Sequence, residues 1–154
     1  MKKVFIFVFA CIFISSCSTA KDTVPVQILA ASLGNKINGF ENMTEVSTDY
    51  IKYCMNSDLS LYSEYIVLYP FSGTEYNEIG IFKVKCEKSI EKGVAEVKNY
   101  LLFKKSNWDT RYMEDEFVKI ENAEVCTLGK YILYAILNDG ERENVIKTFE
   151  EILK

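Results

Sequence analysis

Histidine is absent from this sequence of 154 residues, and its absence excludes several kinds of active site. Without an imidazole, neither a Ser-His-Asp or Cys-His catalytic arrangement nor a histidine-ligated zinc site can form. The seven glycines form neither of the common glycine-rich motifs that bind phosphate groups. We therefore expect that the protein is not an enzyme and that it has no metal or other cofactor.

Arginine and proline are also scarce, since each occurs twice, whereas lysine occurs 16 times. Acidic and basic residues are interspersed and the formal net charge is −4, so no basic stripe is available for the phosphates of a nucleic acid. A hydrophobic content of 49% and a charged content of 26% are ordinary for a globular domain. Length and composition predict one folded domain and no nucleic-acid partner.

The long hydrophobic run of this sequence lies near the N-terminus. Residues 4–14 (VFIFVFACIFI) follow Lys2 and Lys3, and polar residues come after them. This run is too short for a transmembrane helix, which needs ~20 apolar residues. A positively charged start followed by a short apolar run is typical of a secretory signal peptide, which we predict over residues 1–16.

The run ends in the tetrapeptide ISSC, in which an aliphatic residue and two serines precede Cys17. This tetrapeptide resembles the lipobox of bacterial lipoproteins, in which small residues admit the peptidase and the cysteine thiol accepts the lipid. We predict that residues 17–23 are the lipidated Cys17 and a short tether, which reaches ~20 Å at most. The alternative is an ordinary signal peptide that is cut after Ala20.

Hydrophobic periodicity predicts helices and strand pairs in alternation over residues 24–154. The predicted helices cover residues 24–37, 49–55, 89–106, 111–120 and a final stretch that begins at Asn138. The predicted strands cover residues 64–69, 78–85, 124–128 and 130–137. Hairpins followed by helices indicate an α+β fold. We predict a single domain in which two ββα units form a four-stranded antiparallel sheet with helices packed on it, preceded by one or two N-terminal helices.

The patterns also predict how the strands are buried. Residues 78–85 alternate, so we expect a half-buried strand there. Residues 130–137 are apolar on both faces, so we expect that strand to be central in the sheet. Residues 38–47 are polar and predict a loop.

Two helices carry more specific expectations. Tyr50, Tyr53 and Cys54 are candidates for the packed side of the short helix over residues 49–55. Asn138 and Glu141 have the spacing of a capping box at the start of the final helix.

Three cysteines follow the predicted tether: Cys54, Cys86 and Cys126. An odd number cannot pair completely within one chain. We interpret them as small buried hydrophobic residues. The alternatives are one disulfide, which an extracytoplasmic compartment permits, and a reactive thiol, which no histidine is present to activate.

Tyrosines gather around Pro70, and these residues are the candidate binding surface. Tyrosine offers a large contact area and a hydroxyl group at a low entropic cost. The alternative is that these rings pack along the edge of the core. The candidate binding residues are Tyr65, Tyr69, Pro70, Phe71 and Tyr76.

The acidic residues 114–116 point in different directions on a helix, so we interpret them as a solvated face.

Residues 64–85 (EYIVLYPFSGTEYNEIGIFKVK) combine a hydrophobic strand that runs into Pro70, a short polar loop and the segment NEIGIFK. A long helix rich in lysine and glutamate follows, and then a strand pair whose turn contains Gly129 and Tyr131. In this order the features resemble an uncharacterised family of small lipoproteins of Gram-positive bacteria, DUF4358. The resemblance implies a lipid-anchored extracytoplasmic domain without an assigned function, and it supplies no catalytic residues.

Together these observations predict a lipoprotein on the extracytoplasmic face of the cell membrane. Its biochemical role is not specified by any motif, and we expect a non-enzymatic binding or interaction module. The lipid anchor makes the membrane its first partner, and an envelope protein or a small molecule would be its ligand. The alternative is an accessory subunit of an envelope complex, such as a transporter or the machinery of cell-wall synthesis.

Overall fold

The structure, a computed structural model, describes residues 20–71, 75–109, 111 and 113–154. The predicted signal peptide over residues 1–16 and the predicted lipidation site Cys17 lie outside these residues. Within the described ranges, no helix is both long enough and apolar enough to cross a membrane.

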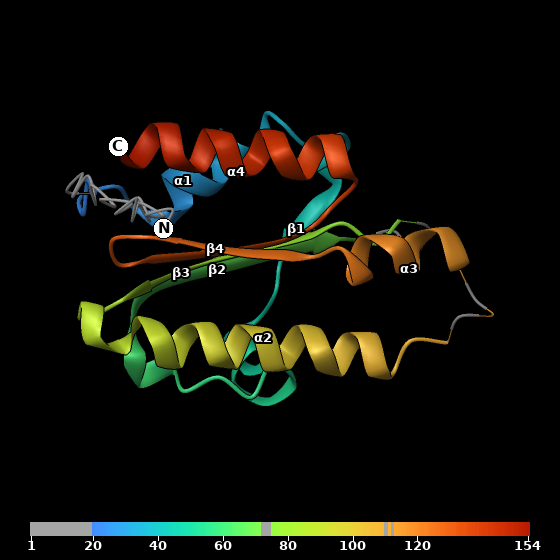
Figure 1. The fold of residues 1–154 in the computed structure, drawn as a ribbon, viewed down its shortest axis with the longest axis horizontal. Helices are drawn as coiled ribbons and strands as arrows, with labels where there is room; N and C mark the ends of the chain where they lie inside the picture. Colours follow the sequence, from blue (N-terminus) through green and yellow to red (C-terminus); the bar gives the residue numbers. More distant parts are fainter. Residues whose placement is uncertain (1–19, 72–74, 110, 112) are drawn as a thin grey trace, which may run out of the picture.

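A five-stranded sheet forms the middle layer of the described part of the chain (Figure 1). The strand order is β1-β2-β3-β5-β4, and every neighbouring pair is antiparallel. The strands are β1 (Met43–Glu45), β2 (Tyr62–Pro70), β3 (Glu78–Val84), β4 (Glu124–Leu128) and β5 (Tyr131–Ile136). The mixed α/β architecture and the antiparallel sheet are confirmed, but the predicted number of four strands is wrong.

The additional strand is β1, which lies in the segment predicted to be a loop. Met43 pairs with Pro70 and Glu45 pairs with Leu68 at the edge of the sheet. None of the three residues of β1 is fully buried, so the strand has no alternating apolar pattern. Met43 packs against the cluster beneath α1 and α4, but one partly buried residue makes no periodic pattern, and backbone pairing with β2 leaves no signal in the sequence.

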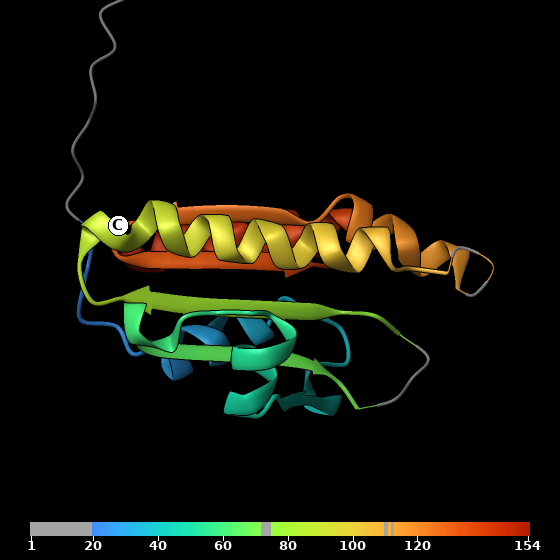
Figure 2. The same ribbon diagram turned by 90° about the horizontal axis from the view of Figure 1, so that it is seen from below.

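Helices cover both faces of the sheet (Figure 1, Figure 2). α1 (Val26–Gly34) and α4 (Asp139–Leu153) pack on one face, and α2 (Ile90–Ser106) packs on the other. α3 (Glu114–Glu121) contacts the C-terminal end of α2, where Lys105 of α2 pairs with Glu121 of α3. The short helical turns are η1 (Phe40–Asn42), η2 (Tyr50–Cys54), η3 (Leu59–Leu61) and η4 (Glu87–Ser89). The two predicted ββα units are therefore present as β2-β3-α2 and β4-β5-α4, with their helices on opposite faces.

Two hydrophobic clusters lie on the two faces of the sheet. Leu33 and Phe149 belong to the cluster beneath α1 and α4, and Val97 and Phe82 belong to the cluster beneath α2. The prediction that the last strand is central is confirmed, because β5 pairs with β3 on one side and with β4 on the other and every residue of it is buried. The prediction that residues 78–85 form a half-buried strand is wrong. Helices cover both of its faces, and in β3 only Lys83 stays partly exposed.

Gly80 in β3 allows a close approach that shapes one end of the molecule. It pairs with Tyr134 of β5, and a β-carbon at this position would collide with the Tyr134 ring. Because Gly80 has no side chain, the aromatic ring lies over the β3 backbone on the α2 side of the sheet. The Tyr134 hydroxyl thereby reaches Glu78, which is two residues before Gly80 on the same face.

One expectation for the helices is wrong in part and another is wrong. In η2, Tyr50 packs against the cluster beneath α2 as expected and Ile51 is buried, whereas Tyr53 is 68% exposed and Cys54 is exposed, so the expectation is wrong for these two residues. The capping box at the final helix does not form, since the Asn138 side chain makes no capping hydrogen bond. Glu141 accepts a hydrogen bond from the backbone N–H of Asn38 instead, at 3.0 Å, and so ties α4 to the segment after α1.

The three cysteines of the described part of the chain are unpaired. Cys54 and Cys86 are exposed, so the interpretation of the cysteines as buried hydrophobic residues is wrong for these two. Cys126 is partly buried, and burial raises the pKa of its thiol to about 12. Such a thiol stays protonated at neutral pH and is a poor nucleophile.

Candidate functional site

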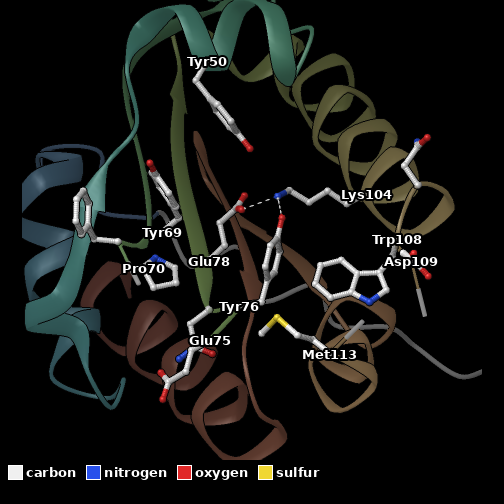
Figure 3. A pocket seen from close by; sticks show the side chains of 13 residues that line it. Tyr50, Tyr69, Pro70, Glu75, Tyr76, Glu78, Lys104, Trp108, Asp109 and Met113 are labelled. Atoms are coloured by element: carbon white, nitrogen blue, oxygen red, sulfur yellow. Dashed lines mark hydrogen bonds and ion pairs between the residues drawn. The ribbon is translucent and has the colours of Figure 1, made fainter. Parts of the chain in front are cut away.

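A cavity of about 600 Å³ opens where β2 ends and β3 begins (Figure 3). Four of the five predicted binding residues line it: Tyr69, Pro70, Phe71 and Tyr76. Tyr69 is 41% exposed and Phe71 is 84% exposed, so neither ring is part of the packed core. Tyr65 does not line the cavity, and its hydroxyl lies 3.4 Å from the hydroxyl of Thr48.

The floor of this cavity, which we call the pocket from here on, holds a buried carboxylate. Glu78 is 3% exposed. Its Oε1 accepts hydrogen bonds from the hydroxyls of Tyr100, at 2.8 Å, and Tyr134, at 2.5 Å. Its Oε2 lies 2.8 Å from the Lys104 Nζ (Figure 3). A buried carboxylate requires this kind of pairing, because an isolated charge in an apolar interior is strongly unfavourable.

Lys104 is held between aromatic rings as well as by Glu78. Its Nζ lies 4.7 Å from the centre of the Tyr76 ring and 4.8 Å from that of Tyr100, and it also donates to the Tyr76 hydroxyl. Burial alone would lower the pKa of Lys104, but attraction to Glu78, the interactions with Tyr76 and Tyr50 and the hydrogen bond to Glu78 together outweigh this effect and raise the pKa. The lysine therefore stays charged, and its charge is matched inside the protein.

Burial has the opposite consequence for the tyrosine hydroxyls around Glu78. Desolvation, followed by repulsion from the Glu78 carboxylate, raises the pKa of Tyr100 and of Tyr134 above the ordinary value. The same two causes raise the pKa of Tyr50, whose hydroxyl lies 2.8 Å from that of Tyr100. These hydroxyls therefore act as hydrogen-bond donors and not as bases.

A second polar cluster joins the residues just before β3 to α3. The Lys119 Nζ donates to Oδ1 of Asn77 at 2.9 Å and to Oε2 of Glu116 at 2.8 Å. The same Glu116 oxygen accepts a hydrogen bond from the backbone N–H of Tyr76 at 2.6 Å. The interpretation of residues 114–116 as a solvated face is therefore wrong for Glu116, which positions Tyr76 on the pocket wall.

The rim carries two further carboxylates and the single tryptophan of the chain. Glu75 and Asp109 line the opening, and Asp109 accepts two hydrogen bonds from the Arg111 guanidinium, at 3.0 and 2.9 Å. These hydrogen bonds lower the pKa of Asp109, so it stays ionised. The Trp108 ring meets the Tyr76 ring edge to face, with 4.9 Å between the ring centres.

Over the described ranges, no group of three or more acidic or cysteine side chains could hold a metal ion.

Sequence reasoning missed the polar floor of the pocket. Two features of the sequence could have indicated it. Glu78 is the first residue of an apolar strand, and Tyr100 and Lys104 are four residues apart on one helix face. Tyr134 gave no such indication, because a tyrosine in the run YILYAIL is indistinguishable from an ordinary core aromatic.

The family described as "Domain of unknown function (DUF4358)" matches residues 37–137, which is more than half of the chain. The chain therefore belongs to this family. The matched region contains all five strands and every residue that lines the pocket. No curated protein and no solved structure matches the chain.

We expect the free energy of unfolding to fall as the pH rises above about 10, the usual pKa of tyrosine. The folded protein holds the protons of Tyr100 and Tyr134 more tightly than the unfolded chain does. The stabilisation that comes from these two protected protons is fully present below pH ~10. It is lost as the pH rises toward the higher pKa values of the two tyrosines in the folded state. Each such tyrosine contributes a slope of about 1.4 kcal/mol per pH unit. Denaturant unfolding at several pH values measures the slope.

Tyr134→Phe should flatten that slope by about 1.4 kcal/mol per pH unit, because one protected proton is removed. Tyr53→Phe is the matched control and should leave the slope unchanged, since Tyr53 is 68% exposed. Equal slopes for the wild type and Tyr134→Phe would contradict the buried network. Ionisation of all ten tyrosines without loss of the native circular dichroism spectrum would also contradict the buried network.

Proposed function

We propose that this chain is a lipid-anchored protein of the outer face of the cell membrane whose domain binds a ligand in the pocket. The observation that carries the proposal is the pocket itself. Its volume of about 600 Å³ falls in the range of small-molecule sites, which are mainly apolar with a few fixed polar groups. Exposed rings such as Tyr69 and Phe71 lose contact with water only when a ligand covers them.

The proposed anchor is supported by the lipobox-like tetrapeptide that ends at Cys17. Part of the proposed tether is also fastened to the domain. The Lys21 backbone N–H donates to the Leu153 carbonyl at 2.8 Å, and the Asp22 carboxylate pairs with Lys130 at 2.5 Å. The chain from Cys17 to Lys21 can span only about 14 Å at most. A lipid on Cys17 would hold the domain close to the bilayer.

The fastened tether also gives the pocket an orientation in this proposal. Asp22 contacts the turn between β4 and β5 and lies 3.9 Å from Lys83 near the end of β3. The pocket lies at the other end of β3, at Glu78, which is ~17 Å away along the strand (Figure 1). The lipid-bearing end would therefore face the membrane, and the pocket would face away from it.

A binding role rather than catalysis is supported by the state of the charged groups. Three carboxylates line the pocket, but Glu78 is paired with Lys104 and Asp109 is paired with Arg111. Neither is available as a proton acceptor without the loss of its partner. With no histidine in the chain, the pocket offers no evident pair of nucleophile and base.

The anchor is tested by metabolic labelling with an alkyne fatty acid. Wild-type protein should carry the label and sediment with membranes, because two acyl chains on one cysteine anchor a protein stably. Cys17→Ala should lose the label and leave the membrane fraction, whereas Cys54→Ala should behave as the wild type because Cys54 belongs to the folded domain. An unlabelled wild-type protein would contradict the anchor without affecting the pocket.

The pocket is tested by native mass spectrometry of protein purified from its own membranes in mild detergent. We expect a bound small molecule on the wild type and its loss from Tyr69→Ala and Phe71→Ala, which remove exposed rings and should leave the fold intact. Tyr53→Ala, at an exposed tyrosine outside the pocket, is the matched control and should retain the molecule. Retention of the same mass in all variants would contradict the proposal.

An accessory subunit of an envelope complex remains the second candidate. It is favoured by exposed apolar side chains away from the pocket, Leu102 and Phe103 on α2 and Val118 on α3. Crosslinking in intact cells separates the two functions. An envelope protein that crosslinks equally to the wild type and to Phe71→Ala would favour the accessory role.

A further inference from the structure

Most polar groups on the pocket wall already have partners inside the protein. The hydroxyls of Tyr50 and Tyr76, Oδ1 of Asn77, the side-chain amide of Asn107 and the carboxylate of Glu78 all take part in internal hydrogen bonds. A sugar or an anion is recognised through many free hydrogen-bonding groups on a site. This wall offers few of them, which disfavours both ligand classes.

The indole N–H of Trp108 does not change this conclusion. Within the described residues it has no hydrogen-bond partner, and the atom is sealed from solvent. It is therefore not a donor that a ligand in the pocket could reach. The indole contributes its ring to the wall instead, next to the ring of Tyr76.

Aromatic rings make up much of the remaining surface of the pocket. Figure 3 shows four aromatic residues around the cavity: Tyr69 from β2, Tyr76 from the segment before β3, Tyr50 from η2 and Trp108 from the segment after α2. Phe71, which follows β2, lines the cavity as well. Faces of aromatic rings attract cations through their quadrupole. The pocket already demonstrates this attraction, since the ammonium group of the protein's own lysine lies within 5 Å of two ring centres.

The charge of the lining is negative. Glu75, Glu78 and Asp109 face a single lysine, Lys104, which leaves two negative charges among the lining residues. Arg111 offsets Asp109 from outside the lining. Glu75 has no cation within ion-pair distance in the described part of the chain. The rim therefore attracts a positive ligand, while the paired floor neither attracts nor repels it strongly.

Resting on the proposed binding function, we infer that the pocket recognises a quaternary ammonium ion, whose nitrogen carries four methyl or other alkyl groups and no hydrogen. Such a cation needs no hydrogen bonds, which suits a wall whose polar groups are occupied. It gains from ring faces and from a nearby carboxylate, and both are present. The apolar substituents on nitrogen would cover the exposed rings of Tyr69 and Phe71.

The single tryptophan makes the inference directly measurable, because Trp108 lines the pocket and is the only source of indole fluorescence. The full-length protein in nonionic detergent is titrated with choline and with 3,3-dimethyl-1-butanol, in which carbon replaces the charged nitrogen. We expect choline to change the Trp108 emission saturably and to bind about tenfold more tightly than its neutral isostere. Equal affinities for the two compounds would overturn the inference.

Matched variants test the two features that carry the inference. Tyr69→Leu should weaken choline binding about fivefold, whereas Tyr69→Phe, which keeps the ring, and Tyr53→Leu, which lies outside the pocket, should not. Glu75→Gln should weaken it about threefold at low salt, and Glu151→Gln on α4 should have no effect. Full binding in both Tyr69→Leu and Glu75→Gln would overturn the inference even if choline binds.

Further ligands separate this inference from the proposed function. A saturable response to N-acetylglucosamine or acetate without one to choline would overturn the ammonium class and leave the pocket as a binding site. A response to phosphatidylcholine vesicles but not to phosphatidylglycerol vesicles would support the ammonium class and assign the cation to a lipid headgroup. No response to any probe, together with no bound molecule in the native protein, would overturn both proposals.

Discussion

The pairing of Glu78 with Lys104 is the interaction on which this end of the molecule depends. Glu78 lies at the first position of a strand that helices cover on both faces, where an unpaired carboxylate would be strongly destabilising. Lys104 supplies the countercharge from the C-terminal turn of α2, and Tyr100 and Tyr134 supply hydrogen bonds from α2 and β5. One carboxylate therefore fixes the position of a helix relative to two strands.

This pairing also explains the chemical character of the pocket. Because Glu78 and Lys104 satisfy each other, the floor of the pocket is polar in composition but nearly neutral in charge. The space above it is bounded by rings such as Tyr76 and Trp108. Gly80 contributes to this arrangement because it leaves room for the Tyr134 ring, whose hydroxyl donates to Glu78. This arrangement supports the proposed binding role.

The sequence predicts the fold better than it predicts the site, and the reasons are physical. Periodicity identifies β2, β3, β4, β5 and the long helices because each places an apolar face against the core. It misses β1, whose three residues are stabilised mainly by backbone pairing. It places Tyr69, Pro70, Phe71 and Tyr76 near one another because they adjoin one loop. It cannot assemble Glu78, Lys104 and Tyr134, which approach only when the sheet and α2 pack together.

A double-mutant cycle on Glu78 and Lys104, measured by denaturant unfolding, tests the central claim most directly. Lys104→Met should lower the free energy of unfolding by about 3–5 kcal/mol, because it leaves a buried carboxylate without its countercharge. Glu78→Gln combined with Lys104→Met should recover at least ~2 kcal/mol of that loss, since the amide oxygen still accepts hydrogen bonds from the two tyrosines. A loss below ~1 kcal/mol for Lys104→Met, with additive effects in the double variant, would contradict the account.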